Sequence, residues 1–417
     1  MSLSTSPAPI PAPPGLLSAD AAEVVQATLP AVREHGVQIT SVFYDAMLAA
    51  HPELRSVFNQ ANQETGKQRQ ALAASVVAFA GWLVGNDDAP FQPVVERIAH
   101  KHASLAVRPE QYLIVGRYLL HAVGEVLGDA VTPAVAAAWD EVYWLAALTL
   151  VAEEARLLQT AGVDLDRPYR PYRVSRRVDE TGDVVSLHLV PEDGSEVPDF
   201  LPGQYVTVVV DLSDGRRQPR QYSLSNAPGQ GFLRLTLGAV RGEGGAPDGA
   251  VSTYLQGQVA EGDVLQMSQP FGDVWLEDGP DPVVLVTAGL GITPAAAMLQ
   301  QIAGTRPHRQ VVHVHADHSP ATHALRTDLT RSSTDLEAFT SRVWYEEPDE
   351  AVAPGARTGH VDPDAIPVPA GARAFLCGPL PFMREARAGL LRQGLPADRI
   401  RYEVFGPDLW ASTMNRA

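Results

Sequence analysis

The spacing of apolar residues changes twice along the 417-residue chain, and this change limits the possible folds more than any other feature. From about residue 18 to 161 apolar side chains recur three and four positions apart, as amphipathic helices require. Short runs rich in β-branched residues follow, separated by Gly, Pro and Asp, which indicates antiparallel strands. From about Asp281 strands apolar on both faces alternate with helices, which favours a parallel sheet. The sequence therefore predicts an all-α domain, an antiparallel β-barrel and an α/β domain.

Proline, glycine and capping residues suggest where these domains begin and end. Thr132 and Pro133 mark the start of the last long helix, and Gly162 marks its end. The prolines at 168 and 171 predict a linker rather than a central strand. The expected boundaries are a disordered Pro-rich lead at 1–17, a helical domain at 18–162, a barrel at 170–279 and a parallel-sheet domain at 280–417.

Composition excludes several kinds of partner. The net charge of -17 disfavours binding to nucleic acid or to an anionic membrane surface. The single cysteine, Cys377, allows no intrachain disulfide and fits a reducing compartment. The start of the chain lacks the features of a signal peptide, and no run of about 18 apolar residues is present. We therefore expect a cytoplasmic protein that acts on small molecules and has no membrane segment.

Two histidines, His100 and His102, lie two positions apart in the string "ERIAHKHASL". Because each residue of a helix turns by about 100°, His102 shares a stripe with Val95, Ile98 and Leu105 and is predicted to point inward. His100 lies about 200° away and is predicted to point elsewhere. An inward histidine taken alone is more often satisfied by a backbone carbonyl than used as a ligand. The pattern by itself leaves both readings open.

Other helices also place polar groups on apolar stripes. Tyr44, Gln68 and Glu154 each occupy a position where an aliphatic side chain is expected. Burying such groups costs free energy unless they are paired. Together with His102 they predict a cavity with polar walls inside the helical domain.

The helical region resembles a globin of the bacterial flavohaemoglobin type. The shared strings are "FYDAML", "HPELRSVFNQANQETGKQRQAL", "ERIAHKHASLAVRPEQYLIVG" and "AWDEVYWLAALTLVAEEA", in the family's order and spacing. The resemblance implies that His102 is the axial ligand of the iron of haem b. It also implies Phe58 on the macrocycle, Tyr44 and Gln68 as distal hydrogen bonders, Leu72 closing the pocket, Tyr112 and Glu154 behind the proximal histidine, and Lys101 near a propionate.

The string "RQYSLS", close after "LPGQYVTV" and followed by "AVSTYL", resembles the flavin-binding signature of the ferredoxin-reductase family. Taken alone, the Arg-x-Tyr-Ser string is equally compatible with an ordinary strand edge. Arginine suits a diphosphate because its planar fork donates two bonds at once. The resemblance implies FAD contacts from Tyr205, Arg220, Gln221, Tyr222 and Ser223, with backbone N–H groups at Gly249, Val251 and Ser252 reaching the phosphates.

Two further loops follow strands that are predicted to be parallel. In "VLVTAGLGITPAAAML" Gly289 and Gly291 form a tight loop before a helix that begins near Thr293, and a helix N-terminus attracts phosphate. The string lacks the third glycine of the dinucleotide fingerprint, so alone it indicates only a turn between strand and helix. Cys377, in "FLCGPLPFM", is by itself most simply a buried small residue. The resemblance implies that Thr293, Cys377, Gly378 and Pro379 lie near the nicotinamide, that Phe405 covers the flavin, and that Glu403 lies near the flavin and haem edges.

The resemblance implies an oxidoreductase with haem b, FAD and NAD(P)H as cofactors. NAD(P)H would reduce FAD, FAD would pass single electrons to haem, and the enzyme would act as a nitric oxide dioxygenase that converts NO and O2 to nitrate. No arginine cluster follows "VVHVHADHS", which favours NADH over NADPH. The expected partners are O2, NO and NADH or NADPH, with no nucleic acid, and the expected state is a monomer or weak dimer. Two alternatives remain: a flavin and haem reductase for peroxides, quinones or ferric acceptors, and a haem-based O2 or NO sensor or binding module.

Overall fold

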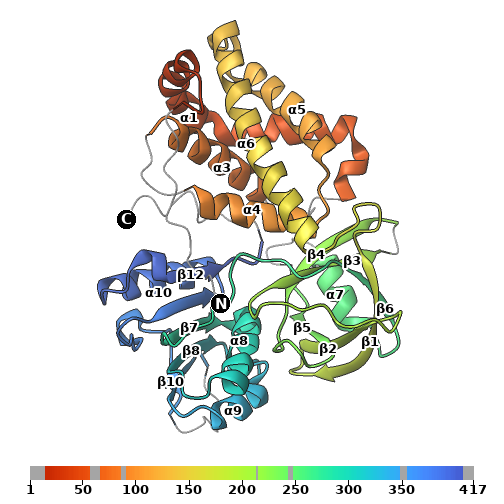
Figure 1. The fold of residues 1–417 in the computed structure, drawn as a ribbon, viewed down its shortest axis with the longest axis vertical. Coiled ribbons are helices and arrows are strands. Elements are labelled where there is room, and N and C mark those ends of the chain that lie inside the picture. Colours follow the sequence, from red (N-terminus) through yellow and green to blue (C-terminus); the bar gives the residue numbers. More distant parts are fainter. Residues whose placement is uncertain are drawn as a thin grey trace. The chain divides into compact units, whose positions relative to one another are not determined.

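The computed structural model describes most of the chain as two compact units (Figure 1). One unit contains Met1–Pro168 with Gly406–Ala417, and the other contains Tyr169–Phe405. Each unit is described by itself below. The predicted Pro-rich lead lies mostly outside the described residues, which are 15–56, 66–85, 91–212, 215–242, 248–347 and 355–406.

The first unit is helical. Helix α1 packs against α3, α5 and α6, and α4 packs against α6. The buried core between them includes Val25, Phe43, Met47 and Trp139. Its elements are α1 (Ala19–Ala50), η1 (Pro52–Ser56), α3 (Lys67–Leu83), α4 (Gln92–Ser104), α5 (Pro109–Leu127), η2 (Gly128–Ala130) and α6 (Pro133–Thr160).

The ends of α6 follow from local chemistry. The hydroxyl of Thr132 accepts the N–H of Val135 at 3.3 Å, and Pro133 is the first helical residue, as predicted. Gly162 follows the helix with a φ of 62°, a conformation that glycine adopts without strain. Among the described residues α6 is the one helix long and apolar enough to cross a membrane by length and composition. It packs against α1, α4 and α5, and 22% of its apolar 18-residue window is buried inside the structure.

The second unit begins with a six-stranded antiparallel sheet in the order β4-β3-β6-β1-β2-β5. An antiparallel bridge between Leu224 and Leu235 joins the two ends of this order, so the sheet closes into the predicted barrel. Helix α7 packs against β4 and β5. The elements are β1 (Arg170–Asp179), β2 (Val184–Pro191), β3 (Tyr205–Asp211), β4 (Arg217–Ser223), β5 (Leu233–Gly238), α7 (Ala250–Gly257) and β6 (Val264–Met267).

Pro171 lies in an interior strand, and the prediction that it belongs to a linker was wrong. Strand β1 lies between β6 and β2 and includes Pro171 as its second residue. Pro171 pairs with Gln266 on β6, whereas the ladder with β2 begins one residue later, at Tyr172. The missing N–H of proline therefore removes no bond from that ladder.

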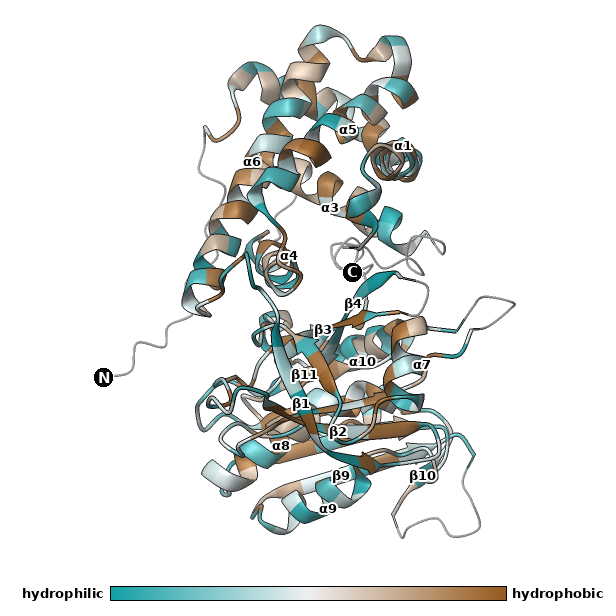
Figure 2. Ribbon diagram, turned by 90° about the vertical axis from the view of Figure 1, so that its right-hand side faces the viewer, coloured by the Kyte–Doolittle hydropathy of each residue, from teal (hydrophilic) through white to brown (hydrophobic). Residues whose placement is uncertain are grey.

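The rest of the second unit is a parallel sheet in the order β10-β9-β8-β7-β11-β12, as predicted. The order reverses between β7 and β11, the kind of point where such sheets bind ligands. In Figure 2 the strands of this unit carry much of the hydrophobic colour. The elements are β7 (Val283–Ala288), η3 (Gly289–Gly291), α8 (Ile292–Thr305), β8 (Val311–Asp317), α9 (Arg326–Thr334), β9 (Phe339–Tyr345), β10 (Arg357–Thr358), η4 (Pro363–Ala365), β11 (Arg373–Cys377), α10 (Leu380–Arg392), η5 (Ala397–Arg399) and β12 (Ile400–Glu403).

Candidate functional site

Three side chains from three helices form a hydrogen-bonded cluster in the helical unit. Nδ1 of His102, on α4, lies 2.7 Å from Oε1 of Glu154 on α6. The hydroxyl of Tyr112, on α5, donates to the same carboxylate oxygen at 2.5 Å and lies 2.9 Å from Nδ1. Glu154 is 3% exposed, so its carboxylate is held inside the bundle. The structure thus brings together the three residues that the family resemblance assigned to the proximal side.

The cluster determines which nitrogen of His102 is available. A carboxylate acceptor fixes Nδ1 as the donor, which leaves the lone pair on Nε2. Within the described part of the chain Nε2 makes no hydrogen bond, and the side chain of His102 is 32% exposed. Burial, with the charge of Glu154, raises the pKa of Tyr112, so its hydroxyl stays protonated and donates. The imidazole is thus oriented by its two partners, which suits a metal ligand.

Tyr143, which the sequence did not single out, lies on α6 and supports this cluster through Tyr112. Its hydroxyl donates to the backbone carbonyl of Tyr112, so α6 fixes α5 where the cluster forms. The ring lies against Gly116, and a Cβ there would lie 2.4 Å from Tyr143 Cε1. A glycine on α5 at this helix contact was the available signal.

The exposures of the two neighbouring histidines are the reverse of the prediction. His100 is buried at 9% exposure, whereas His102 is partly exposed. The buried residues of α4 include Ala99 and Ala103. Val95 of the predicted stripe is also buried, so the buried face of α4 includes Val95 together with Ala99, His100 and Ala103. His102 lies at the edge of that face.

The residues predicted on the distal side belong to α1 and α3. Tyr44 is 4% exposed and packs edge-to-face on Phe43, with ring centroids 4.7 Å apart. Gln68 and Leu72 are partly buried on α3. The hydroxyl of Thr40 donates to the carbonyl of Arg69 at 2.9 Å and links the two helices. Lys101 is partly buried on α4, and Phe58 lies outside the described residues.

In the barrel the "RQYS" string forms the end of β4, paired with β3. Tyr205 lies opposite Ser223, and Gln221 lies opposite Thr207. Arg220 donates to Oε1 of Gln218 at 3.2 Å and to the carbonyl of Pro219 at 2.7 Å. The set that the sequence predicted here, Tyr205, Arg220, Gln221, Tyr222 and Ser223, therefore occupies two adjacent strands.

Arg220 carries a positive charge that the described residues do not neutralise. It is partly buried, and among the described residues it has no carboxylate partner. Burial lowers the pKa of Arg220, which measures the cost of removing its charge from water. A guanidinium in this setting favours an anionic ligand.

The turn before α7 is tight. The N–H of Gly249 donates to the carbonyl of Val240 at 2.8 Å. The hydroxyl of Ser252 accepts the N–H of Val240 at 3.1 Å and donates to the carbonyl of Gly249 at 2.9 Å. A Cβ at Gly249 would lie 2.7 Å from this hydroxyl. The side chain of Ser252 therefore holds the turn, and the N–H groups of Val251 and Ser252 lie in the first turn, where helices leave donors without internal partners.

The loops after β7 and β11 touch where the sheet order reverses. A Cβ at Gly291 would lie 2.1 Å from the carbonyl oxygen of Cys377, which excludes any side chain there. Gly378 has a φ of 155°, and a Cβ there would lie 3.0 Å from the Cβ of Ala288. The two glycines let the backbones meet at the carboxyl ends of the strands.

The other residues predicted near the nicotinamide surround these loops. Thr293 is 3% exposed, and its hydroxyl donates to the carbonyl of Leu290 at 2.9 Å. Cys377 is buried opposite Glu403, and burial, with the charge of Glu403, raises the pKa of its thiol well above the usual value. Pro379 precedes α10. Phe405 is 54% exposed near the end of the unit.

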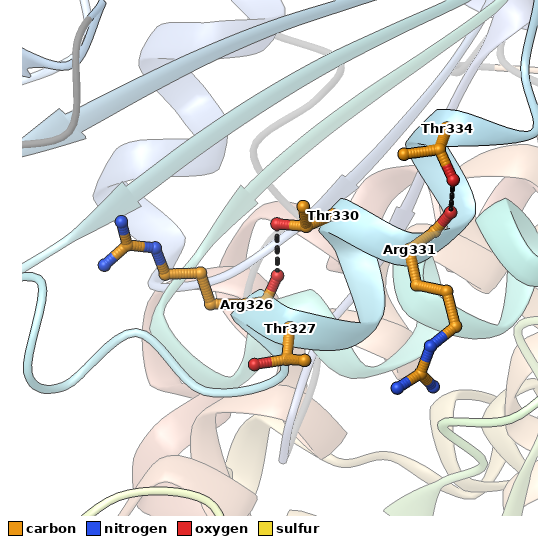
Figure 3. A pocket seen from close by; sticks show the side chains of 5 residues that line it. All are labelled: Arg326, Thr327, Thr330, Arg331 and Thr334. Carbon is orange, nitrogen blue, oxygen red and sulfur yellow. Dashed lines mark hydrogen bonds between the residues drawn. The ribbon is translucent and has the colours of Figure 1, made fainter.

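A shallow hollow of about 490 Å³ lies away from these residues, along α9 (Figure 3). Its threonine hydroxyls at 330 and 334 donate to carbonyls of the same helix, at 2.9 and 2.7 Å. Figure 3 shows the guanidinium groups of Arg326 and Arg331 pointing in different directions. The hollow therefore presents no convergent set of polar groups.

Family models match both ends of the chain. A globin model matches residues 41–148, within the helical unit, and a model of the oxidoreductase NAD-binding domain matches residues 285–388, within the parallel-sheet domain. With the barrel between them, these matches define a class of protein: a globin joined to a flavin and nicotinamide reductase module. This agrees with the predicted fold class.

Relatives of nearly equal length identify the family. The flavohemoprotein of Bordetella parapertussis is 42% identical over 404 residues, which cover 94% of this chain and 99% of the relative. The crystal structure of flavohemoglobin from Malassezia yamatoensis, with bound FAD and heme, is 34% identical with a TM-score of 0.83 and covers 94% of this chain and 100% of that one. The FAD/NAD-binding domain of nitric oxide dioxygenase from Vibrio cholerae is 32% identical with a TM-score of 0.54, over 58% of this chain and 100% of that one. This chain belongs to the flavohemoprotein family, as the resemblance implied.

Proposed function

We propose that this protein is a nitric oxide dioxygenase that uses NAD(P)H, FAD and haem b to convert NO and O2 to nitrate. The observation that carries the proposal is the cluster of His102, Glu154 and Tyr112, joined by contacts of 2.5 to 2.9 Å. The relative from Vibrio cholerae, which is named a nitric oxide dioxygenase, matches the reductase half of the chain. The match to flavohemoproteins over 94% of the chain favours this function over a reductase of other acceptors or a sensor.

The residues of the helical unit fit a haem. His102 would offer Nε2 as the ligand. Glu154 accepts the hydrogen bond from the N–H at Nδ1, which orients the ring and would make Nε2 a stronger electron-pair donor to the metal. Tyr112 donates to Glu154 and stabilises its negative charge. On α1 and α3, Tyr44 would donate its O–H and Gln68 its amide N–H to the reacting oxygen.

The residues of the second unit fit FAD and a nicotinamide nucleotide. Arg220 would neutralise the flavin pyrophosphate, and the first turn of α7 would donate backbone N–H groups to it. The loop at Gly289 and Gly291 would lie against the nicotinamide nucleotide beside Thr293 and Gly378. When bound, FAD supplies the conversion of a two-electron hydride donor into single-electron steps, and haem supplies the iron at which O2 and NO react.

We further propose that the haem domain ends with α6, that the FAD domain is the barrel and that the parallel-sheet domain binds the nucleotide. NADH is the proposed donor. We place the protein in the cytoplasm, because its one cysteine allows no intrachain disulfide, and we expect it to be a monomer or weak dimer.

The decisive experiment measures NADH-dependent NO consumption in aerobic solution with His102→Ala. We expect the variant to lose haem absorbance and at least about a hundredfold in NO consumption, because Nε2 of His102 is the proposed ligand of the haem iron. His121→Ala is the matched control, since His121 is an exposed histidine on α5. If NO consumption survives in a haem-free variant, the proposed function is wrong.

A further inference from the structure

A buried arginine links the barrel to the parallel-sheet domain. Arg234, on β5, is 6% exposed, and its Nε donates to the hydroxyl of Ser225 at 3.0 Å. The same guanidinium donates to the carbonyl of Ser225 and to the carboxylate of Asp328, which belongs to α9. A buried charge is costly unless it is paired, so Arg234 and Asp328 depend on each other.

Gln300, on α8, makes the second link. Its Nε2 donates to the carboxylate of Asp328 at 3.5 Å, and its Oε1 accepts the N–H of Ala227 at 3.1 Å and a side-chain N–H of Gln230 at 3.3 Å. The loop that follows β4 is thus attached to α8 directly and to α9 through Arg234. The loop is also bonded to β5, since Oδ1 of Asn226 accepts the backbone N–H of Arg234 at 2.7 Å.

The hydrogen-bonded group of Ser225, Arg234, Asp328 and Gln300 is linked along the chain to both proposed ligand sites. Ser225 follows the flavin residues Tyr222 and Ser223 in the chain, just after the end of β4. Gln300 lies on α8, whose first turn contains Thr293 and follows the loop at Gly289–Gly291. A helix of this length is stiff, so a contact at Gln300 fixes the position of its first turn.

We propose that Arg234, acting with Asp328 and Gln300, is a positioning residue for hydride transfer, because it holds the flavin strand at a fixed distance from the nicotinamide loop. This inference rests on the proposed function. Hydride transfer needs the reacting atoms within about 3 to 3.5 Å, and a displacement of about 1 Å costs about a hundredfold in rate. None of the three residues needs to touch either ligand for this effect.

Asp328→Asn in the full-length holoprotein tests the proposal. Flavin reduction by NADH is followed under anaerobic conditions by rapid mixing over a range of NADH concentrations. We expect the limiting rate per bound flavin to fall by at least about tenfold, with the half-saturating NADH concentration changed by less than about twofold. A merely structural role would lower the melting temperature and flavin content but leave the limiting rate per bound flavin unchanged.

The chain offers a matched control in Arg331→Ala. Arg331 lies 3.5 Å from the other oxygen of the same carboxylate, but its side chain is 73% exposed. We expect its limiting rate to stay within about twofold of the wild-type rate, because exposed ion pairs contribute little.

Gln300→Ala keeps the proposal testable if Asp328→Asn does not fold. It removes the link to Ala227 without leaving a buried charge unpaired, and we expect a fall of about threefold in the limiting rate. A wild-type limiting rate in any folded variant of Asp328 or Gln300 overturns the proposal. If NADH does not reduce the flavin of the wild-type protein, the proposed function fails instead.

Discussion

His102 in the helical unit and His323 in the parallel-sheet domain both bond a tyrosine hydroxyl through Nδ1, but their environments differ. His102 lies 2.9 Å from Tyr112 and also has a buried carboxylate at 2.7 Å. His323 lies 2.8 Å from Tyr345 and is 6% exposed. Its Nε2 is buried without a hydrogen-bond partner among the described residues. The difference is between an oriented ring whose side chain is partly exposed and an enclosed neutral ring.

His323 belongs to a group of three neighbouring imidazoles, in which His313 and His315 are stacked and His323 is tilted against His315. His315 lies 4.2 Å from His323 and 6.0 Å from His313, measured between ring centroids. His315 has partners at both nitrogens, Thr287 at 2.9 Å and Asp317 at 3.3 Å. In the part of the chain that the structure describes, Nε2 of His313 is buried without a partner, as Nε2 of His323 is.

Burial decides the protonation of these rings. Burial, with the charge of His315, lowers the pKa of His313 to about 3. Burial, with the other two histidines and Arg326, lowers the pKa of His323 to about 2, although Asp317 opposes this. The comparison teaches that burial keeps an imidazole neutral, whereas a carboxylate at one nitrogen and an accessible second nitrogen suit an imidazole to bind a metal.

The largest expected effect is acid sensitivity of the second unit. The folded pKa values of His313 and His323 lie below the unfolded value of about 6.5, so the unfolded state binds more protons between pH 6.5 and 3. Stability is full above pH 6.5 and falls with decreasing pH by about 1.4 kcal/mol per unit for each ring. Urea unfolding at pH 7.5 and at pH 5.0 measures this loss.

His313→Phe isolates the contribution of one ring, since an aromatic side chain preserves the stacking on Phe339. Between pH 6.5 and 5 the variant should lose about 2 kcal/mol less free energy of unfolding than the wild type. The free energy of unfolding measured at pH 7.5 is subtracted for each protein, so a difference in packing between the two proteins cancels. Equal losses in the two proteins would contradict the assignment of His313 as a buried neutral ring.

The second effect concerns the carboxylate at Nδ1 of His102, which neither His313 nor His323 has among the described residues. Glu154→Gln keeps the shape of the acceptor but removes its charge from Nδ1 of His102. We expect haem to be retained and NO consumption to fall about 10- to 100-fold, because partners behind a ligand tune its donor strength. The iron–histidine stretching frequency, measured by resonance Raman spectroscopy, should fall in parallel. A wild-type frequency would remove Glu154 from the proposed proximal role.

The smallest effect is expected when each of the two tyrosines is replaced by phenylalanine. Tyr345→Phe leaves Nδ1 of His323 without its partner and should lower the free energy of unfolding by about 1 to 3 kcal/mol. Tyr112→Phe leaves the bond between His102 and Glu154 in place, so it should cost less stability and change NO consumption by only a few fold. Thermal melts and NO consumption of both variants check this pair. The reverse order of stability losses would show that the two tyrosines play other roles.

Much of the fold could be read from local patterns. The helical, antiparallel and parallel regions differ in apolar spacing, and the limits of α6 follow from Thr132, Pro133 and Gly162. A polar cavity in the helical domain could also be predicted, because Glu154 is a carboxylate on an apolar stripe, whereas the grouping of Glu154 with Tyr112 and His102 came from the family resemblance. Such signals are local, so one sequence is enough to show them.

The features that the sequence did not predict depend on contacts between segments that are far apart in the chain. His100 is buried because the buried face of α4 also includes Ala99 and Ala103, which a stripe of large apolar residues does not reveal. Pro171 fits an interior strand because the ladder with β2 begins one residue later. Arg234 pairs with Asp328 across 94 residues, and no spacing in the sequence indicates that pair. Pairing partners of this kind are set by topology rather than by local propensity.

The buried Cys377 has a practical consequence for experiments on this protein. It is the single cysteine of the chain, and its thiol is enclosed and protonated beside Glu403. Thiolate is the reactive form, so alkylating reagents should modify the native protein slowly and the opened protein fast. Labelling at this position therefore reports when the junction of β7 and β11 comes apart, without any residue having to be replaced.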